Sequence, residues 1–207
     1  MPVTVADHPL LEAAWGALRW PKPLGELVTP ATIGARLSRG CVAPALADSA
    51  RLAVRDLLRA TGFKPSGRKK PASEYLVGAA AEGRLTSINV AVDLCNAVSL
   101  HGGLPISVVD LQRSVGPHRL LACEKGTTYV FNSSGQFLDL GGLLALWDAE
   151  GPCAGPVKDS QRTKTDEGTV VVGVVVWGSV KLPGHAGRLW RQYVETAALL
   201  GAVEETW

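Results

Sequence analysis

The stretch VVVGVVVW, from Val170 to Trp177, holds apolar side chains at every position except one glycine. A strand with one face in solvent would alternate apolar and polar residues, and this stretch does not alternate. It therefore predicts a strand buried on both faces, with a layer of structure on each side. Its eight residues fall far short of the roughly 20 that a helix needs to cross a bilayer.

Short apolar runs separated by turns precede this strand and predict further strands. Helical periodicity appears before those runs and again after the strand. The predicted strands cover residues 105–111, 119–123, 127–131 and 137–140, and the predicted helices cover residues 49–60, 73–82, 89–101 and 187–200. An order of helices, then strands, then a closing helix favours the α+β class.

The N-terminal part of the chain is the hardest to interpret. Residues 8–20 have apolar side chains near i, i+3, i+4 spacing, which predicts a short amphipathic helical segment before Pro21. Residues 24–47 remain ambiguous. We expect one domain over residues 1–207, with a helical extension over 1–50, a core over 51–180 and a closing helix over 187–200.

Composition excludes several classes of protein. The chain has 207 residues, 46% hydrophobic, and a net charge of +2, so no overall field draws it to nucleic acid. No N-terminal apolar run is long enough for a signal peptide, and we expect a cytoplasmic protein without a membrane partner. The four cysteines form no CxxC pair, which predicts buried, reduced thiols: Cys41, Cys95, Cys123 and Cys153.

The sequence contains no nucleotide-binding motif, no zinc-protease motif and no nucleophile-elbow motif of the hydrolases. No metal or cofactor is therefore expected. Three polar clusters remain. The first is a helix face with Asn89, Asp93, Asn96, Ser99 and His101; the second is residues 156–169, PVKDSQRTKTDEGT; the third is the basic loop with Lys64, Arg68, Lys69 and Lys70. Each has an ordinary structural interpretation: a solvated, capped helix face, a mixed-charge turn and a solubilising loop.

Each cluster also has a functional interpretation. The amide of Asn96 can bind an ammonium group or an ester carbonyl, although it is not a general base. Residues 156–169 offer donors for phosphate oxygens and ribose hydroxyls directly before the buried strand. The basic loop suits a salt-sensitive contact with an RNA backbone that carries no base information.

From about Arg51 to Trp177 the chain resembles the B3/4 domain, the tRNA-binding and editing region of the phenylalanyl-tRNA synthetase β subunit, and more closely its freestanding relatives. Two stretches carry the resemblance: residues 88–111, INVAVDLCNAVSLHGGLPISVVDL, and residues 156–165, PVKDSQRTKT. The resemblance implies a β-sandwich-like mixed-sheet core flanked by helices. It also implies an activity that removes a wrong amino acid from tRNA.

Only some of the family's pocket residues have a matching residue in this chain. Asn96 matches a family asparagine that contacts the bound amino acid, whereas the family's pocket histidine falls on Ser107 and its specificity carboxylate falls near Asp159 or Ser160. The implied catalytic residues are Asn96, Ser107 and Asp159; the implied substrate-binding residues are Asn89, Ser99, His101, Ser160 and Gln161. The implied tRNA-binding residues are Lys158, Arg162, Lys164, Arg68, Lys69 and Lys70.

The leading hypothesis is a cofactor-independent, freestanding aminoacyl-tRNA deacylase that edits mischarged tRNA in translation quality control. An aminoacyl ester is already activated by its neighbouring ribose hydroxyl, so the protein has mainly to bind the amino acid, orient water and stabilise the oxyanion. A non-catalytic tRNA- or RNA-binding module associated with an aminoacyl-tRNA synthetase is the alternative. A third possibility is a pocket for free amino acids or small peptides.

Overall fold

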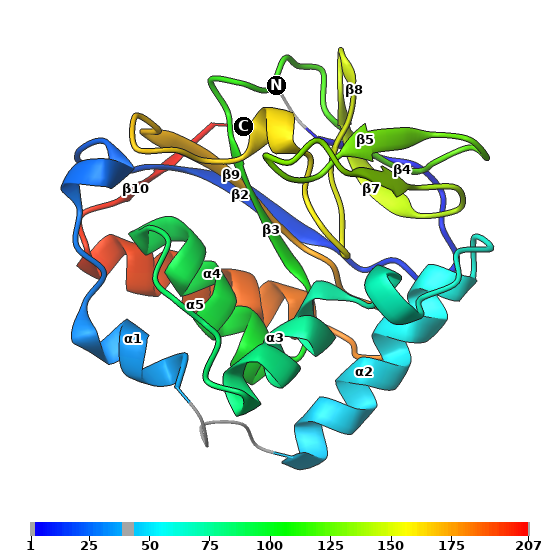
Figure 1. The fold of residues 1–207 in the computed structure, drawn as a ribbon, viewed down its shortest axis with the longest axis horizontal. Coiled ribbons are helices and arrows are strands. Elements are labelled where there is room, and N and C mark those ends of the chain that lie inside the picture. The colour runs from blue at the N-terminus through cyan, green and yellow to red at the C-terminus, as the bar shows by residue number, and fades with distance from the viewer. Residues whose placement is uncertain (1–2, 39–43, 207) are drawn as a thin grey trace.

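The computed structural model describes residues 3–38 and 44–206, which form an α+β fold (Figure 1). The α+β class predicted from the sequence is confirmed. The helices are α1 (Ala31–Arg36), α2 (Pro44–Arg59), α3 (Ala72–Ala81), α4 (Val90–Gly102) and α5 (His185–Leu199), with short 3-10 turns η1 (Leu24–Glu26), η2 (Gly67–Lys69) and η3 (Gln161–Thr163). In this part of the chain no helix is long and apolar enough to cross a membrane.

Two four-stranded sheets and a hairpin make up the β structure. The central sheet has the order β10 (Val203–Glu205), β2 (Ala14–Arg19), β9 (Val171–Val176) and β3 (Ile106–Asp110). The second sheet has the order β1 (Thr4–Val5), β4 (Arg119–Ala122), β7 (Leu144–Asp148) and β8 (Gly151–Ala154), and the hairpin joins β5 (Thr128–Val130) to β6 (Phe137–Asp139).

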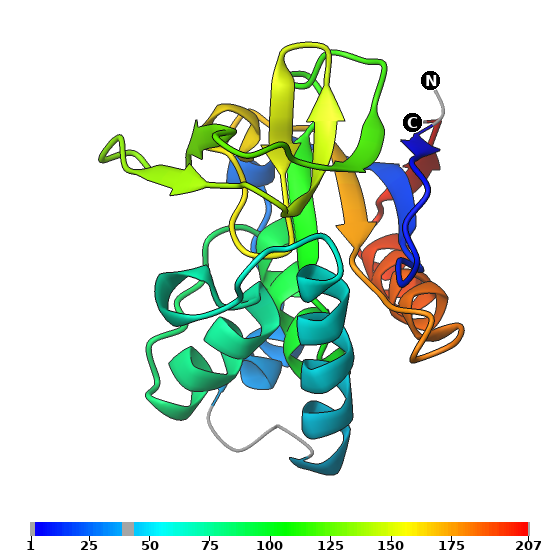
Figure 2. The same ribbon diagram turned by 90° about the vertical axis from the view of Figure 1, so that its right-hand side faces the viewer.

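Strand β9 is buried on both faces, as its sequence predicts. Val172, Val174 and Val176 belong to the core between the central sheet and the helices. Val175 and Trp177 belong to a second core shared with the other sheet. The molecule therefore has helices on one side of the central sheet and the second sheet on the other, an arrangement that Figure 2 shows from the side.

The predicted helical segment over residues 8–20 is wrong, because Ala14–Arg19 form strand β2. This strand pairs with β9 along its whole length, from Ala14 opposite Val176 to Arg19 opposite Val171. Its Gly16 lies beneath the ring of Trp190 from α5, where a Cβ atom would overlap the indole. Tertiary pairing thus overrides a local apolar spacing that suits a helix.

The later elements follow the sequence more closely. The predicted strands in 105–140 correspond to β3, β4, β5 and β6, and the predicted helices correspond to α2, α3, α4 and α5. No strand is predicted over residues 144–154, yet β7 and β8 form an antiparallel hairpin there. Four of the five residues of β7 are buried, so this strand lacks the alternation that identifies a half-exposed one.

Three of the four cysteines lie among the described residues, and all three are free and buried, as predicted: Cys95, Cys123 and Cys153. Burial raises the pKa of the Cys95 thiol, and it raises those of Cys123 and Cys153 to about 12. These thiols are therefore unreactive at neutral pH. Cys41 lies outside the described residues.

We expect Gly16→Ala to lower the free energy of unfolding by about 1–3 kcal/mol, because the added methyl group overpacks the sheet–helix contact. Its Cβ would lie 2.2 Å from Cζ2 of Trp190. Urea denaturation measures the change. The matched control is Gly78→Ala within α3, where a Cβ meets nothing within 4 Å. The control should be more stable than the parent by up to about 1 kcal/mol, and equal losses in both variants would contradict the packing argument.

Candidate functional site

Ser107 and Asp159, two of the residues singled out in the sequence, lie together. Ser107 belongs to β3 and is 1% exposed. Its hydroxyl donates a hydrogen bond to the carbonyl of Gly155 at 3.3 Å and accepts one from the indole N–H of Trp177 at 2.9 Å. Asp159 lies in the segment after β8, and its carboxylate accepts a hydrogen bond from the Gly155 N–H at 3.1 Å. Strand β3 and the segment after β8 therefore form one site.

The carboxyl group of Asp159 is unusually basic. Burial raises its pKa to about 6, while hydrogen bonding from Ser107, Gly155 and Val108 and the charge of Lys164 act in the opposite direction. Within residues 3–38 and 44–206, no ion pair includes this carboxylate. A partly buried carboxylate with a strongly shifted pKa and no ion-pair partner is typical of a functional site.

Two lysines flank Asp159 and share one aromatic neighbour. The Nζ atom of Lys164 donates a hydrogen bond to the carbonyl of Phe131 at 2.6 Å. The Nζ atom of Lys158 lies 3.8 Å from the centre of the Phe131 ring, close enough for a cation–π interaction. Burial lowers the pKa of both lysines, and the charges of Arg68 and Lys164 lower that of Lys158 further. Arg68, Lys158 and Lys164 therefore form one cationic group beside Asp159.

Helix α4 approaches this site with its first two turns. The Cys95 thiol donates a hydrogen bond to the carbonyl of Ile106 at 3.4 Å, and the charge of Asp159 contributes to the raised pKa of Cys95. Asn96 follows in the helix and is partly exposed. No hydrogen bond joins its side-chain amide to another group in the described part of the chain. The side-chain amide of Asn96, one residue after Cys95 in α4, is therefore available for a ligand.

Asn89 connects the start of α4 to the segment that carries Asp159. Its side-chain oxygen caps the helix by accepting the Val92 N–H at 3.0 Å. Its amide nitrogen donates to the Thr165 hydroxyl at 3.1 Å. One end of the side chain therefore caps the helix, and the other end holds the helix against residues 156–169.

Three other residues expected to bind substrate make contacts within the fold: Ser99, His101 and Ser160. The Ser99 hydroxyl donates to the carbonyl of Leu104 at 2.7 Å at the end of α4, and His101 Nε2 lies 2.9 Å from the carbonyl of Arg36. The Ser160 hydroxyl accepts the Arg162 N–H at 3.4 Å as the cap of η3. Gln161, the first residue of η3, is partly exposed.

Arg162 forms an ion pair with the buried carboxylate of Asp148. Its Nη1 and Nη2 atoms each lie 2.8 Å from one carboxylate oxygen of Asp148, whose side chain is fully buried. Burial opposes ionisation of Asp148, but hydrogen bonds from Arg162 and from the N–H groups of Glu150 and Val115 outweigh it and lower the pKa. Arg162 is therefore committed to holding η3 on β7.

A polar group that no sequence motif indicates surrounds Asp148. Ser114 Oγ lies 2.6 Å from His118 Nε2 and donates to Asp148 at 3.3 Å. Burial lowers the pKa of His118, and the charge of Asp148 acts against this shift. Ser114 and Asp148 are far apart in the chain and match no motif, so only the fold brings them together. Among the described residues no cluster of His, Cys, Asp or Glu suits a metal ion.

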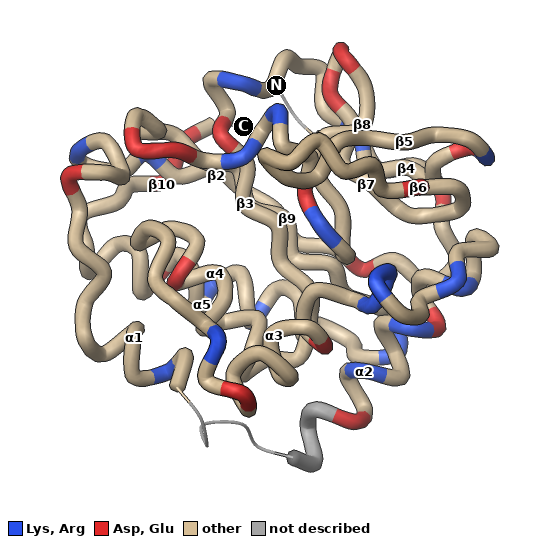
Figure 3. The backbone as a smooth tube through the Cα atoms, viewed as in Figure 1, with Lys and Arg blue, Asp and Glu red and all other residues tan. Residues whose placement is uncertain are grey.

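The basic loop lies at the end of α2, where Figure 3 shows basic residues gathered around η2. Arg68 and Lys70 are exposed. The Nζ atom of Lys69 forms an ion pair with Asp139 at 2.7 Å and lies 5.6 Å from the centre of the Phe63 ring. The loop is thus fixed against the β5–β6 hairpin by one lysine and leaves three cations in solvent, Lys64, Arg68 and Lys70.

Comparisons with known proteins show partial similarity to solved structures only. No protein-family model and no curated protein sequence matches the chain. A similar solved structure is an N-terminal fragment of the phenylalanyl-tRNA synthetase β subunit from Pyrococcus horikoshii, with 18% identity and a TM-score of 0.48. The match covers 54% of this chain and 40% of the fragment, so the chain spans less than half of that fragment's length.

Arg162→Ala should destabilise the protein by about 3 kcal/mol, because it leaves the buried carboxylate of Asp148 without its partner. Thermal unfolding at pH 7 measures the change. The matched control is Arg59→Ala, which breaks an exposed ion pair with Asp56 and should cost about 1 kcal/mol or less. Because the pKa of Asp148 is lowered by folding, the difference between parent and Arg162→Ala should shrink as the pH falls below about 4. A difference that is independent of pH would contradict this account.

Asp159→Asn should stabilise the protein at pH 8 by about 1–3 kcal/mol. The ordinary pKa of this carboxyl is 3.8 and the folded protein raises it to about 6. Folding therefore favours the protonated form, and the free energy of unfolding of the parent falls as the pH rises through this window. Asparagine carries no charge and avoids the penalty. Urea denaturation at pH 3 and pH 8 tests this: the gain should appear only at pH 8, and a loss of stability at pH 8 would refute it.

Proposed function

We propose that this protein is a freestanding deacylase, acting in the cytoplasm, that hydrolyses the ester bond of mischarged aminoacyl-tRNA. One observation carries the proposal: the carboxylate of Asp159 lies without an ion-pair partner beside the cationic group of Arg68, Lys158 and Lys164. An aminoacyl-tRNA end presents the complementary charges, an ammonium group and a phosphate backbone, within one small volume. The sequence resemblance of residues 88–111 to the editing domain supports the same assignment.

Asp159 binds the ammonium group of the aminoacyl moiety in this mechanism. Its pKa of about 6 leaves it ionised at neutral pH, and its partly buried position strengthens the pairing with a cation. Phosphates of the terminal nucleotides contact Lys158 and Lys164, which hold the ester bond over the site. These phosphate contacts position the RNA and carry no sequence information.

Water performs the hydrolysis. Its oxygen attacks the ester carbonyl carbon, and the bond between that carbon and the ribose oxygen breaks. The departing ribose oxygen takes up a proton from the attacking water and becomes a hydroxyl, which yields free amino acid and uncharged tRNA. The amide of Asn96 donates a hydrogen bond to the carbonyl oxygen as negative charge develops there. Ser107 is a positioning residue, because Trp177 and Gly155 already occupy its hydroxyl.

A non-catalytic tRNA-binding module that accompanies an aminoacyl-tRNA synthetase is the second candidate. It is favoured by the same engagement of Ser107, which stands where the resembling family has a histidine and makes contacts only within the fold. In that case Arg68 and Lys70, two of the exposed cations of the basic loop, would provide the main contact with RNA. The binding would weaken steeply as the salt concentration rises.

We expect the purified protein to release amino acid from at least one tRNA in a panel of mischarged and correctly charged species. Asn96→Ala should lower kcat/KM by about 100-fold, because it removes a donor to the developing oxyanion. Asp159→Asn should raise KM about tenfold or more, because it removes a charged partner of the ammonium group. The readout is the loss of labelled amino acid from tRNA.

Glu167→Gln is the matched control, because this carboxylate lies in the same segment but is exposed. It should retain parental rates. No release above the spontaneous rate from any tRNA would reject the deacylase. Salt-sensitive tRNA binding without release, weakened by Arg68→Glu and Lys70→Glu, would support the binding module instead.

A further inference from the structure

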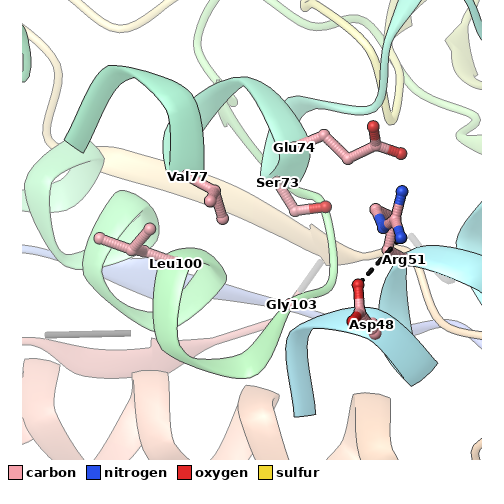
Figure 4. Close-up of a pocket in the computed structure, with 7 residues that line it drawn as sticks. All are labelled: Asp48, Arg51, Ser73, Glu74, Val77, Leu100 and Gly103. Carbon is pink, nitrogen blue, oxygen red and sulfur yellow. Dashed lines mark hydrogen bonds and ion pairs between the residues drawn. The ribbon is translucent and has the colours of Figure 1, made fainter. Parts of the chain in front are cut away.

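A cleft of about 180 Å³ lies between α2, α3 and α4, and none of its lining residues belongs to the Asp159 site. Figure 4 shows its walls: the first turns of α3, the C-terminal end of α4 and one face of α2. Its volume is well below the roughly 300 Å³ at which sites for drug-sized ligands begin. A ligand of the size of one amino acid is therefore the largest that fits.

One end of the cleft is built to receive an anion. Ser73, the second residue of α3, is only 3% exposed, and in the described part of the chain no group hydrogen-bonds its hydroxyl. Figure 4 shows this hydroxyl directed towards Arg51 of α2. At the start of α3 the Ala72 N–H bonds the Pro156 carbonyl at 2.8 Å and the Glu74 N–H bonds the Pro71 carbonyl at 3.0 Å, so among the described residues the Ser73 N–H is the donor left for a ligand at this positive end of the helix. A carboxylate placed here would contact a hydroxyl, a helix start and a guanidinium.

The neighbouring part of the cleft suits a cation. Helix α4 ends here at Gly103, which adopts a left-handed conformation, and the carbonyl groups of its last turn carry partial negative charge. The carboxylate of Asp48 also lines the cleft, where it forms an exposed ion pair with Arg51 at 2.9 Å, whereas the lining carboxylate of Glu74 is paired with Arg55 at 2.6 Å. Arg51 is the only cationic side chain among the described lining residues, so the cleft would repel a ligand with several negative charges.

Apolar side chains form the remaining wall. Val77 lies one turn after Ser73 on α3, and Leu100 of α4 faces it across the cleft (Figure 4). Both belong to or pack against a small apolar cluster between these helices. An aliphatic side chain in contact with them is removed from water, which favours binding.

We propose that this cleft binds a free aliphatic α-amino acid as a zwitterion. Its carboxylate contacts Ser73 and Arg51 and its ammonium group contacts the end of α4 and Asp48, so the ligand inserts into the exposed Arg51–Asp48 ion pair. Its side chain packs on Val77 and Leu100. The opposed helix ends supply both signs of charge within the length of one amino acid. This site is separate from the Asp159 site and does not depend on deacylase activity.

Isothermal titration of the full chain tests the proposal with three probes. L-leucine should bind saturably at a single site. N-acetyl-L-leucine, which lacks the ammonium group, and L-leucinamide, which lacks the carboxylate, should each bind about tenfold more weakly or not at all, because each loses a charge-assisted hydrogen bond.

Variants locate the binding. Ser73→Ala and Arg51→Ala should each weaken L-leucine binding by about tenfold. Arg59→Ala, an exposed arginine at the other end of α2 and outside the cleft, should bind as the parent does. Val77→Trp, which fills the cleft, should abolish binding while the thermal unfolding transition is retained.

The outcomes separate this site from the proposed deacylase site. Binding that is lost in Ser73→Ala and kept in Asp159→Asn supports the cleft, whether or not the protein hydrolyses aminoacyl-tRNA. No saturable binding of L-leucine overturns the proposal. Binding that is lost only in Asp159→Asn also overturns it, because the amino acid then occupies the other site.

Discussion

The burial of β9 on both faces is the constraint on which the rest of the structure depends. Alternate valines of this strand pack on the helices, and the others pack with Trp177 against the second sheet. Because β9 pairs with β2 on one side and β3 on the other, it also determines where Ser107 lies. The indole N–H of Trp177 then bonds the Ser107 hydroxyl. The buried strand thus positions a polar group at the candidate site.

Residues 156–169 are irregular in structure but are held at several points. The Tyr129 hydroxyl donates to the carbonyl of Lys158, and the Thr163 hydroxyl donates to the carbonyl of Cys153 at 2.7 Å. Asn89 and Asp148 hold the same segment from α4 and β7. These contacts keep the Asp159 carboxylate partly buried although ionisation there is unfavourable. A segment held in this way presents a charged group without much reorganisation, which is what electrostatic catalysis requires.

Much of the fold was predictable wherever local pattern and tertiary contact agree. The apolar run of β9 and the capped periodicity of α4 identify their structures from the residues alone. Strand β2 was missed because its pairing partner β9 lies far along the chain. Strand β7 was missed because its apolar run is shorter than that of β9, and a short apolar run does not distinguish a strand from a helix. The site was predicted less well. Asp159 and Ser107 do lie together, but nothing in the sequence shows that Arg162 binds Asp148 rather than solvent or RNA.

The pairing of β2 with β9 has a consequence for the newly made chain. Ala14 is opposite Val176, so most of the polypeptide separates two neighbouring strands of one sheet. During synthesis β2 leaves the ribosome early and has no partner until β9 emerges. Contacts between such distant segments slow folding, because the long intervening loop must close first. The central sheet therefore assembles late, and β2 stays without its strand partner until β9 is available.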